Sequence, residues 1–461
     1  MTIRIDFTNM MATAISGGIA PDQWADAIAQ FGTIRRGVAD RRERGDLGFL
    51  DLTDADAMRT EIRTFAEGMG QAFSDVVLLG IGGSALGPIA LRSALRSTRW
   101  NEMDDETREY FPRLHVVENV DPSTLGPLLD RLELGRTLFL VISKSGGTAE
   151  TMAQYLIVRG RLETELGDRA ARHFVFITDP ERGALRQIAE RDGVASLAIP
   201  PNVGGRFSVL SAVGLLPAAL IGIDIDALLE GAADMKVRCE AESLEENPAG
   251  VFAALHWIAD THLGLRTHVF MPYADPLREL AHWFVQLWAE SLGKIRPDGT
   301  SVGPTPLPAL GATDQHSQVQ LFMEGPRDKT VAFVHVAEPA MDLEIPALHA
   351  DIPELAYLGG KTLGGLLDAE RRATAAALAQ RGRPNLTITL DALDARHMGG
   401  MLMLLEIETI FAGEWYGVDP LDQPGVELGK RFTYALMGRP DAEAARREWD
   451  AIAVPSKRNV V

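Results

Sequence analysis

Residues 137–158 read TLFLVISKSGGTAETMAQYLIV, and this stretch decides the fold prediction. An apolar run that ends at Ile142 has the composition of a buried strand, and helical periodicity resumes at Thr151. The residues between them are Ser143, Lys144, Ser145, Gly146, Gly147 and Thr148. Three hydroxyls, one ammonium and the free N–H groups at a helix start form a cradle for a phosphate. The stretch therefore predicts a strand, a phosphate-binding loop and a helix.

The same alternation of strand and helix continues on both sides of this stretch. Short β-rich runs separated by helical pattern occur at Val76–Leu79, Leu114–Val117, Leu138–Ile142, Phe174–Ile177 and Ser196–Ile199. After Pro200-Pro201 the pattern restarts, with runs at Thr267–Met271, Val331–Val336 and Leu386–Leu390. This order predicts an α/β fold with parallel strands and crossover helices. We expect four segments, namely an N-terminal helical segment (1–70), a first α/β domain (71–200), a second (201–437) and a tail (438–461).

The composition limits the class of protein. The chain has 461 residues, with 45 Lys and Arg against 64 Asp and Glu, and its net charge of −19 disfavours nucleic acid and anionic membranes as partners. Cys239 is the only cysteine, which excludes an intrachain disulfide and fits a reducing compartment. Residues 1–16 lack the pattern of a signal peptide, and no apolar run reaches the roughly 20 residues of a membrane span. We expect a cytoplasmic protein.

A second glycine-rich loop follows the first strand. Residues 80–88 read GIGGSALGP, where the glycines allow a tight turn and Ser84 adds a hydroxyl. A dinucleotide fingerprint is one alternative, but the spacing is not GxGxxG, and Glu118 lies about 35 residues beyond Gly83 rather than about 20. A turn that serves only strand–helix packing is another. Two such loops at the carboxyl ends of one sheet favour a ligand site.

An arginine follows two glycines just after the predicted boundary, in Gly204-Gly205-Arg206. Arg206 has two interpretations that the segment alone leaves open. It can face a cleft and stabilise a developing oxyanion, or it can bridge the two domains.

Residues 277–294 predict an amphipathic helix. Its apolar stripe consists of Leu277, Leu280, Phe284, Leu287, Trp288 and Ser291. Gln286 and Glu290 share one flank, and Trp283 on that flank indicates a buried or cleft-facing side where a carboxylate can act as a general base. The alternative is a surface ion pair between Glu290 and Lys294, four residues apart.

Residues 304–318 predict a rigid loop that enters a helix. Thr313 is the expected N-cap and His316 lies in the first turn, where the helix dipole keeps an imidazole neutral. A plain surface histidine is the alternative. None of the ten histidines has HxH, HxxxH or HExxH spacing, so we predict no metal site. Lys430 lies in a helix after a Pro/Gly turn, and nothing local marks it as special.

The scattered segments together resemble the glucose-6-phosphate isomerase family, whose members contain two sugar-isomerase (SIS) domains. The segments are GIGGSALGP, ISKSGGTAET, VGGRFSVLSAVG, the Gln286–Glu290 helix ending in ESLGK, TDQHSQVQL and DQPGVELGK. They occur in the family's order over residues 80–430, and TDQHSQ and DQPGVELGK resemble the bacterial branch. The resemblance implies two SIS-type three-layer α/β/α sandwich domains with mainly parallel sheets, plus N-terminal and C-terminal helical segments.

The resemblance also implies an activity, which is the interconversion of D-glucose 6-phosphate and D-fructose 6-phosphate through a cis-enediolate, with no cofactor and no metal. Glu290 would move a proton between C2 and C1, Arg206 would stabilise the charge of the intermediate, and Gln286 would line the site. The sugar 6-phosphate would be held by Ser84, Ser143, Lys144, Ser145 and Thr148, and the substrate would also contact Gly83 and Gly205.

Two further residues complete the site that the resemblance implies. His316 would help to open the sugar ring, and Lys430 would lie near the ring oxygen. Since the family's histidine comes from the neighbouring subunit, we expect a homodimer in which His316 reaches the partner's site.

Three other functions fit the sequence less well. A sugar-phosphate sensor shares SIS domains, but such sensors often carry a basic DNA-binding module that is not evident here. A dehydrogenase would leave SKSGGT unexplained. A glutamine-dependent aminosugar synthase needs an N-terminal nucleophilic cysteine, and the only cysteine is Cys239. Side activity on mannose 6-phosphate stays open.

Overall fold

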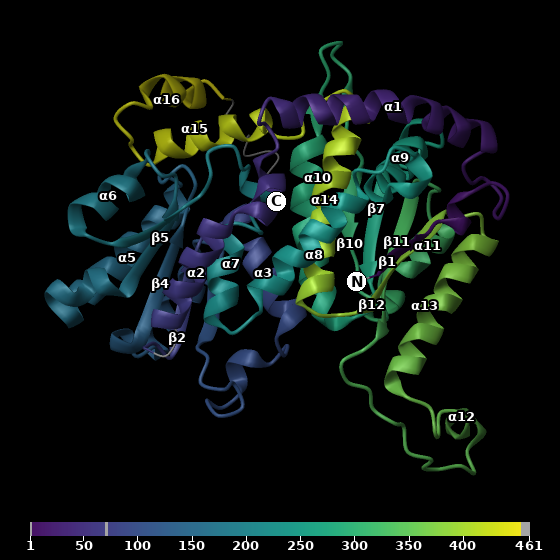
Figure 1. The fold of residues 1–461 in the computed structure, drawn as a ribbon, viewed down its shortest axis with the longest axis horizontal. Coiled ribbons are helices and arrows are strands. Elements are labelled where there is room, and N and C mark those ends of the chain that lie inside the picture. The colour runs from purple at the N-terminus through teal and green to yellow at the C-terminus, as the bar shows by residue number, and fades with distance from the viewer. Residues whose placement is uncertain (1, 70–71, 453–461) are drawn as a thin grey trace, which may run out of the picture.

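The computed structural model describes residues 2–69 and 72–452, and it contains two five-stranded sheets, each with helices on both faces. Figure 1 shows the first sheet on the left, the second on the right, and a group of helices between them. Both sheets are mainly parallel, which confirms the predicted α/β class.

The first sheet has the strand order β3-β2-β4-β5-β6, and every neighbouring pair is parallel. Its strands are β2 (Asp75–Leu79), β3 (Arg113–Val117), β4 (Thr137–Ile142), β5 (Phe174–Thr178) and β6 (Ala195–Ala198). All the β-rich runs predicted in this half therefore form strands. The residues of β2 and β4 are buried throughout, as expected for strands covered on both faces.

Alternation along these strands separates two hydrophobic cores. Val77 and Leu79 point to one face, where they pack with α4 (Pro122–Arg131), α5 (Ala149–Leu166) and α6 (Ala184–Asp192). Val76 and Leu78 point to the other face. That face is covered by α2 (Asp56–Met69), α3 (Leu86–Leu95) and α7 (Ala212–Leu220). The first sheet is thus the middle layer of an α/β/α sandwich.

The second sheet has the order β1-β12-β11-β7-β10. Its strands are β1 (Ile3–Asp6), β7 (Thr267–Pro272), β10 (Thr305–Pro308), β11 (Lys329–Glu338) and β12 (Asn385–Ala392). All neighbours are parallel except β1, which pairs antiparallel with β12. The outer face packs against α11 (Val319–Glu324) and α13 (Leu363–Gln380).

Two strands of this sheet correct the prediction. Residues 1–70 are not only helical, because Ile3–Asp6 forms the edge strand β1. Residues 304–318 are not only a loop, because Thr305–Pro308 forms β10 at the other edge. Proline cannot donate to a strand ladder, but an edge strand has one side without a partner, so the two prolines of β10 are tolerated there.

A shared core joins the two sheets. The inner faces of both contribute to one large hydrophobic cluster, together with the helices that lie between the sheets in Figure 1. These helices are α8 (Ile225–Arg238), α10 (Arg278–Leu292) and α14 (Ala395–Tyr416). The helix α9 (Pro248–Thr261) packs against α14, and α1 (Pro21–Glu43) runs across the end of α14. The helix α7 packs against α2 and α3, so the segment after residue 200 returns to the first half. The predicted four-segment division remains a proposal.

Side chains at the helix starts explain where several of these helices begin. Asp121 and Asn247 accept hydrogen bonds from the first-turn N–H groups of α4 and α9, and proline occupies the first position of each helix. Asp224 and Asp394 cap α8 and α14 in the same way. Such caps satisfy backbone donors that have no partner inside the helix.

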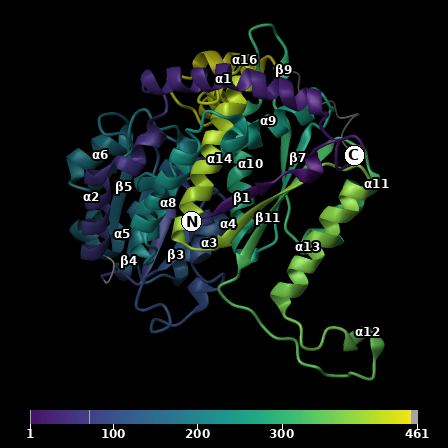
Figure 2. The same cartoon turned by 45° about the vertical axis from the view of Figure 1, so that its right-hand side comes forward.

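Two segments project from the body. Residues 339–362, here called the arm, leave the end of β11, include α12 (Pro353–Ala356) and return to α13, and Figures 1 and 2 both show the arm extending away from the sheets. At the other end of the chain, α15 (Glu427–Leu436) packs against α16 (Glu443–Asp450), with the rings of Phe432 and Trp449 in contact. Within the described residues, no helix is long and apolar enough to cross a membrane.

Candidate functional site

The predicted phosphate cradle follows β4, and its hydroxyls converge. The Oγ atom of Ser143 lies 2.9 Å from Oγ1 of Thr148 and 3.5 Å from Oγ of Ser145. Thr148 occupies the N-cap position of α5, but its side chain does not cap the helix. The first-turn N–H groups of α5 are therefore available to an anion, as at other phosphate-binding helix starts.

The second glycine loop and the cradle lie at the same edge of the first sheet, because they follow β2 and β4, which are neighbouring parallel strands. It contains the 3₁₀ turn η3 (Gly82–Ser84), which touches the turn η7 (Gly205–Phe207). A Cβ atom on Gly83 would lie 2.1 Å from the carbonyl oxygen of Gly205, so only glycine permits this approach. The glycines thus bring the loop with Ser84 against the turn that carries Arg206.

Lys144 binds backbone carbonyl groups of the segment after β6. Its Nζ atom donates to the carbonyl oxygens of Pro201 and Val203, at 2.7 and 2.8 Å. The side chain is half-buried, and burial lowers the pKa of the Lys144 ammonium. Lys144 therefore ties the cradle to the segment that leads into Gly205 and Arg206. Its predicted contact with a phosphate remains untested.

Arg206 is buried at the centre of the site, and each nitrogen of its guanidinium has a partner. Nε donates to Oγ of Ser291 at 2.6 Å, and Nη1 donates to Oε1 of Gln423 at 3.0 Å. Nη2 donates to the carbonyl oxygens of Pro420 and Asp422. Burial lowers the pKa of Arg206, and Glu290 opposes that effect. A buried charge that is hydrogen-bonded on every side has a fixed position, which a stabiliser of developing charge requires.

Glu290 lies beside this guanidinium. Its Oε1 atom is 3.4 Å from Nη1 of Arg206, and its Oε2 atom accepts a hydrogen bond from Nε2 of Gln286 at 3.1 Å. The Glu290 side chain is 27% exposed, so the carboxylate is reachable from outside. The predicted alternative, an ion pair with Lys294, is wrong, because Lys294 pairs with Asp422 instead.

Gln286 joins the helix α10 to the glycine loop. A Cβ atom on Gly82 would lie 2.9 Å from Nε2 of Gln286, so this side chain touches η3 as well as Glu290. The structure therefore brings together the loop with Gly83 and Ser84, the turn with Gly205 and Arg206, and the flank with Gln286 and Glu290. A carboxylate, a fixed cation and a phosphate-type cradle suit proton transfer on a phosphorylated substrate.

His316 is not part of this group of residues. It is exposed and ends the 3₁₀ turn η10 (Thr313–His316), beside the second sheet. The prediction that Thr313 caps a helix with His316 in its first turn is wrong, since the residue at the cap position is Ala312 and α11 begins only at Val319. The short 3₁₀ turn forms because Asp314 accepts a hydrogen bond from the N–H of Leu310, which folds the chain back before α11.

Lys430 also lies apart from Glu290. It is on α15, its side chain is half exposed, and its Nζ atom bonds to Glu427 at 2.8 Å. The helix is amphipathic, but Ala435 is its only buried residue, and Leu428 and Leu436 are exposed. Within one copy of the chain, neither His316 nor Lys430 forms a hydrogen bond or ion pair with Glu290 or Arg206 among the described residues.

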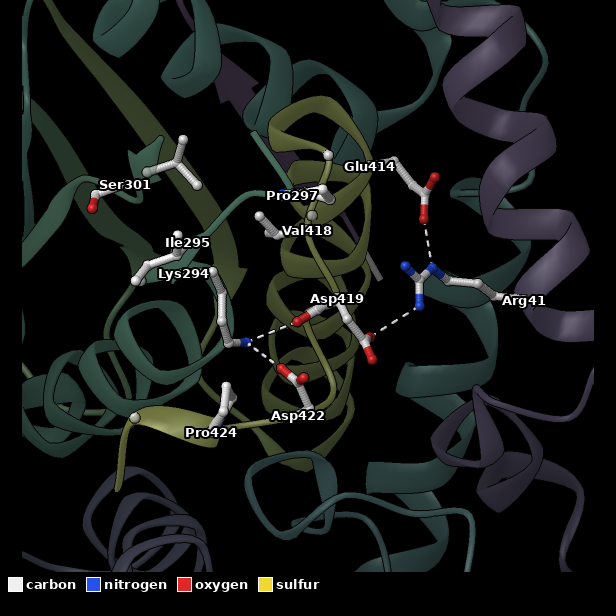
Figure 3. A pocket seen from close by; sticks show the side chains of 15 residues that line it. Arg41, Lys294, Ile295, Pro297, Ser301, Glu414, Val418, Asp419, Asp422 and Pro424 are labelled. Carbon is white, nitrogen blue, oxygen red and sulfur yellow. Dashed lines mark hydrogen bonds and ion pairs between the residues drawn. The ribbon is translucent and has the colours of Figure 1, made fainter. Parts of the chain in front are cut away.

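A cavity of about 990 Å³ lies behind the chain segment that binds Arg206. Figure 3 shows Lys294 reaching toward Asp419 and Asp422, and Arg41 lying between Glu414 and Asp419. The charged side chains that line the cavity are thus paired with one another. Among the described residues, no group of three or more His, Cys, Asp or Glu side chains could hold a metal ion.

A family model described as phosphoglucose isomerase matches residues 52–454, which is most of the chain. This chain belongs to the phosphoglucose isomerase family. The match includes all the segments on which the resemblance was based.

Two curated proteins named glucose-6-phosphate isomerase illustrate the similarity. The one from Carboxydothermus hydrogenoformans is 44% identical over 453 residues, which cover 97% of this chain and 97% of that protein. The one from Rubrobacter xylanophilus is 52% identical over 375 residues, which cover 80% of this chain and 84% of that protein.

Solved structures agree with the fold. A hypothetical protein from Thermus thermophilus has a TM-score of 0.85 and 40% identity, and the match covers 95% of this chain and 100% of that one. A glucose-6-phosphate isomerase from Chlamydia trachomatis has a TM-score of 0.74 at 24% identity, covering 87% of this chain and 77% of that one, and it supports the fold alone.

Three residues that surround Arg206 were not predicted as site residues from the sequence. Gln423 lies within the DQPGVELGK segment, and Ser291 and Lys294 lie within ESLGK. The sequence signal that could have identified them is their position inside the two segments DQPGVELGK and ESLGK, which carry the family resemblance. Their partners were not predictable, because Arg206 and Gln423 are 217 residues apart in the chain.

Proposed function

We propose that this chain is an aldose–ketose isomerase that interconverts D-glucose 6-phosphate and D-fructose 6-phosphate. One observation carries the proposal, namely the Glu290 carboxylate held between Gln286 and the buried Arg206, beside the glycine loop that contains Gly82 and Ser84. The proposed activity is the one for which the curated relatives of the same family are named.

The proposed reaction is a proton transfer between adjacent carbons of the open-chain sugar. The Glu290 carboxylate removes the proton from C2 of the aldose and returns it to C1, while the hydroxyl proton on O2 passes to O1, which yields the ketose through a cis-enediolate. Negative charge develops on the substrate oxygens in the intermediate. Arg206 supplies a positive charge that is already in place, so no reorganisation is needed when that charge appears.

The phosphate serves as an anchor far from the reacting carbons. We assign its contacts to the hydroxyls of Ser84, Ser143, Ser145 and Thr148 and to the free N–H groups at the start of α5. Binding energy from such an anchor can be used to orient C1 and C2 against Glu290.

A homodimer is part of the proposal. The arm exposes a set of large apolar side chains, which are Met341, Leu343, Leu348, Ile352, Leu355 and Tyr357. A bridge between Glu344 and Thr362 holds the base of the arm, so these side chains belong to a defined protrusion. Soluble monomers rarely expose such a group, and we assign a second copy of this chain as its occupant.

In that dimer, the exposed His316 acts in the partner's site as the acid that opens the sugar ring. Lys430 assists at the ring oxygen when α15 approaches. We further propose that the protein is cytoplasmic and binds no nucleic acid. The net charge of −19 and the buried Cys239, the lone cysteine, support this part of the proposal.

A coupled assay tests the activity. Purified protein is given fructose 6-phosphate, and glucose 6-phosphate is detected with its dehydrogenase, with and without EDTA. We expect turnover that EDTA does not change. A protein that binds the sugar phosphate without turnover is a sensor and contradicts the proposal, and sensitivity to EDTA contradicts a mechanism without metal.

A further inference from the structure

Two buried cations, Arg206 and Lys294, bind the same short segment. This segment, residues 419–423, connects α14 to α15 and is here called the 419–423 loop. Arg206 donates to its carbonyl oxygens at Pro420 and Asp422 and to the side chain of Gln423. Lys294 donates to the carbonyl oxygen of Asp419 at 2.8 Å and pairs with the carboxylate of Asp422 at 3.1 Å.

Ser291 connects the two cations directly. Its hydroxyl accepts the hydrogen bond from Nε of Arg206 at 2.6 Å, and its backbone carbonyl accepts one from Nζ of Lys294 at 2.9 Å. Ser291 is fully buried, and it follows Glu290 in α10. A closed ring of hydrogen bonds therefore connects Lys294, Ser291, Arg206 and the 419–423 loop. The Arg206 member of this ring lies beside the Glu290 carboxylate.

The environment of Lys294 shows what its charge is used for. The side chain is 7% exposed, and burial lowers the pKa of its ammonium although Asp422 opposes this. An ammonium has three donors, and here the Ser291 carbonyl, the Asp419 carbonyl and the Asp422 carboxylate take one each. Figure 3 shows the Lys294 side chain turned toward the loop rather than into open space. The Lys294 ammonium therefore uses two of its three donors to bind the 419–423 loop.

We propose that Lys294 is a positioning residue for the reaction, because it fixes the 419–423 loop and thereby holds the Arg206 guanidinium at the Glu290 carboxylate. This inference rests on the proposed function. Among the described residues Lys294 forms no hydrogen bond or ion pair with Glu290, so in this proposal it acts through Arg206. Without the ammonium, the loop carbonyls can move, and the guanidinium loses its fixed position.

The test is a double-mutant cycle between Lys294→Met and Arg206→Lys, with turnover of fructose 6-phosphate as the readout. We expect Lys294→Met alone to lower kcat at least about tenfold while KM changes by less than about threefold. In the Arg206→Lys background, the same substitution should lower kcat by less than about twofold, because its effect passes through Arg206. Lys294→Arg, which keeps the charge, should restore part of kcat.

Lys329→Met is a matched control. Lys329 is enclosed to a similar degree, with 10% of its side chain exposed, and it also binds an aspartate and a carbonyl, at Asp328 and Pro326. These partners lie at the start of β11 and have no contact with Arg206. We expect Lys329→Met to change thermal stability but to leave kcat within about twofold of wild type.

The outcomes separate this inference from the function on which it rests. Equal effects of Lys294→Met in both backgrounds, or an unchanged kcat, overturn the inference alone. If Lys294→Met does not fold, Asp422→Asn takes its place, and an unchanged kcat in that variant overturns the inference. A wild-type protein without turnover overturns the proposed function and this inference together.

Discussion

At the scale of single residues, the guanidinium of Arg206 determines the geometry of the site. Its planar fork donates to a hydroxyl, an amide and two carbonyls, and it meets one carboxylate, that of Glu290. A lysine has the same charge but cannot reach partners on so many sides. The identity of this residue, and not only its charge, therefore matters.

Arg206→Lys should lower kcat about 100-fold to 1,000-fold, the range seen when a preorganised charge stabiliser is lost. The expected change in KM is smaller, because the phosphate anchor remains. Steady-state kinetics with fructose 6-phosphate measure both values.

Arg92→Lys is the control for Arg206→Lys. Arg92 is largely enclosed and donates to the carbonyl oxygen of Leu114, away from the site. Similar losses of kcat in both variants would mean that Arg206 acts only through stability.

At the scale of elements, a buried polar cluster crosses the interface of β7, α9 and α14. The rings of His256 on α9 and His268 on β7 stack at 4.0 Å, and His256 lies 3.4 Å from Glu408 on α14. Glu406, on the same helix as Glu408, is fully buried and has no partner for either oxygen among the described residues. Burial lowers the pKa of His256 to about 3 and raises the pKa of Glu406 well above its ordinary value.

The raised pKa of Glu406 predicts the pH dependence of stability. Between the unfolded and folded pKa values the native state binds one more proton, so the free energy of unfolding falls as pH rises, by at most about 1.4 kcal/mol per pH unit. Glu406→Gln has no carboxyl group to titrate, so the substitution removes this decrease in the free energy of unfolding. Urea unfolding at pH 5 to 8 should therefore show a stability advantage of the variant that grows with pH.

A constant difference between Glu406→Gln and wild type across that range would contradict the raised pKa. The lowered pKa of His256 has the opposite sign, because stability is lost as pH falls from the unfolded value toward about 3. Measurements above about pH 7.5 separate the two effects, since His256 is then almost entirely neutral in both the folded and the unfolded state.

At the scale of the whole molecule, the site is built from loops of the first sheet and from a helix that packs against the second sheet. The cradle and the glycine loop belong to the first sheet, whereas α10 packs against the second. His316 extends the proposed site to a second copy of the chain. A mixed dimer can test that arrangement.

Glu290→Gln and His316→Asn subunits should complement each other when they are unfolded and refolded together. If His316 serves the partner's site, half of the dimers are mixed and one site in each is intact, so about a quarter of wild-type activity returns. Without exchange between subunits, activity should stay at the level of the separate variants. Light scattering on the mixture measures whether dimers are present.

Much of this fold is predictable from the sequence, for stated physical reasons. Strands buried on both faces, such as β4, appear as continuous apolar runs. The strand β1 alternates apolar and charged residues (IRID) and so has no continuous apolar run, and β10 is masked by Pro306 and Pro308.

Within the candidate site, the sequence predicts residue types better than partners. Gln286 and Glu290 are neighbours because they lie one helical turn apart. By contrast, the contacts of Lys144 with Pro201 and of Lys294 with Asp422 join distant parts of the chain, and no local pattern encodes them.

The central claim is that Glu290 is the base that moves the proton, and one comparison tests it most directly. Turnover of fructose 6-phosphate is measured for Glu290→Gln and for Glu279→Gln, a control in the first turn of the same helix α10. We predict that Glu290→Gln lowers kcat at least about 100-fold while the variant still binds a 6-phosphate analogue, and that Glu279→Gln stays within about threefold of wild type. Turnover near the wild-type rate in Glu290→Gln would contradict the account.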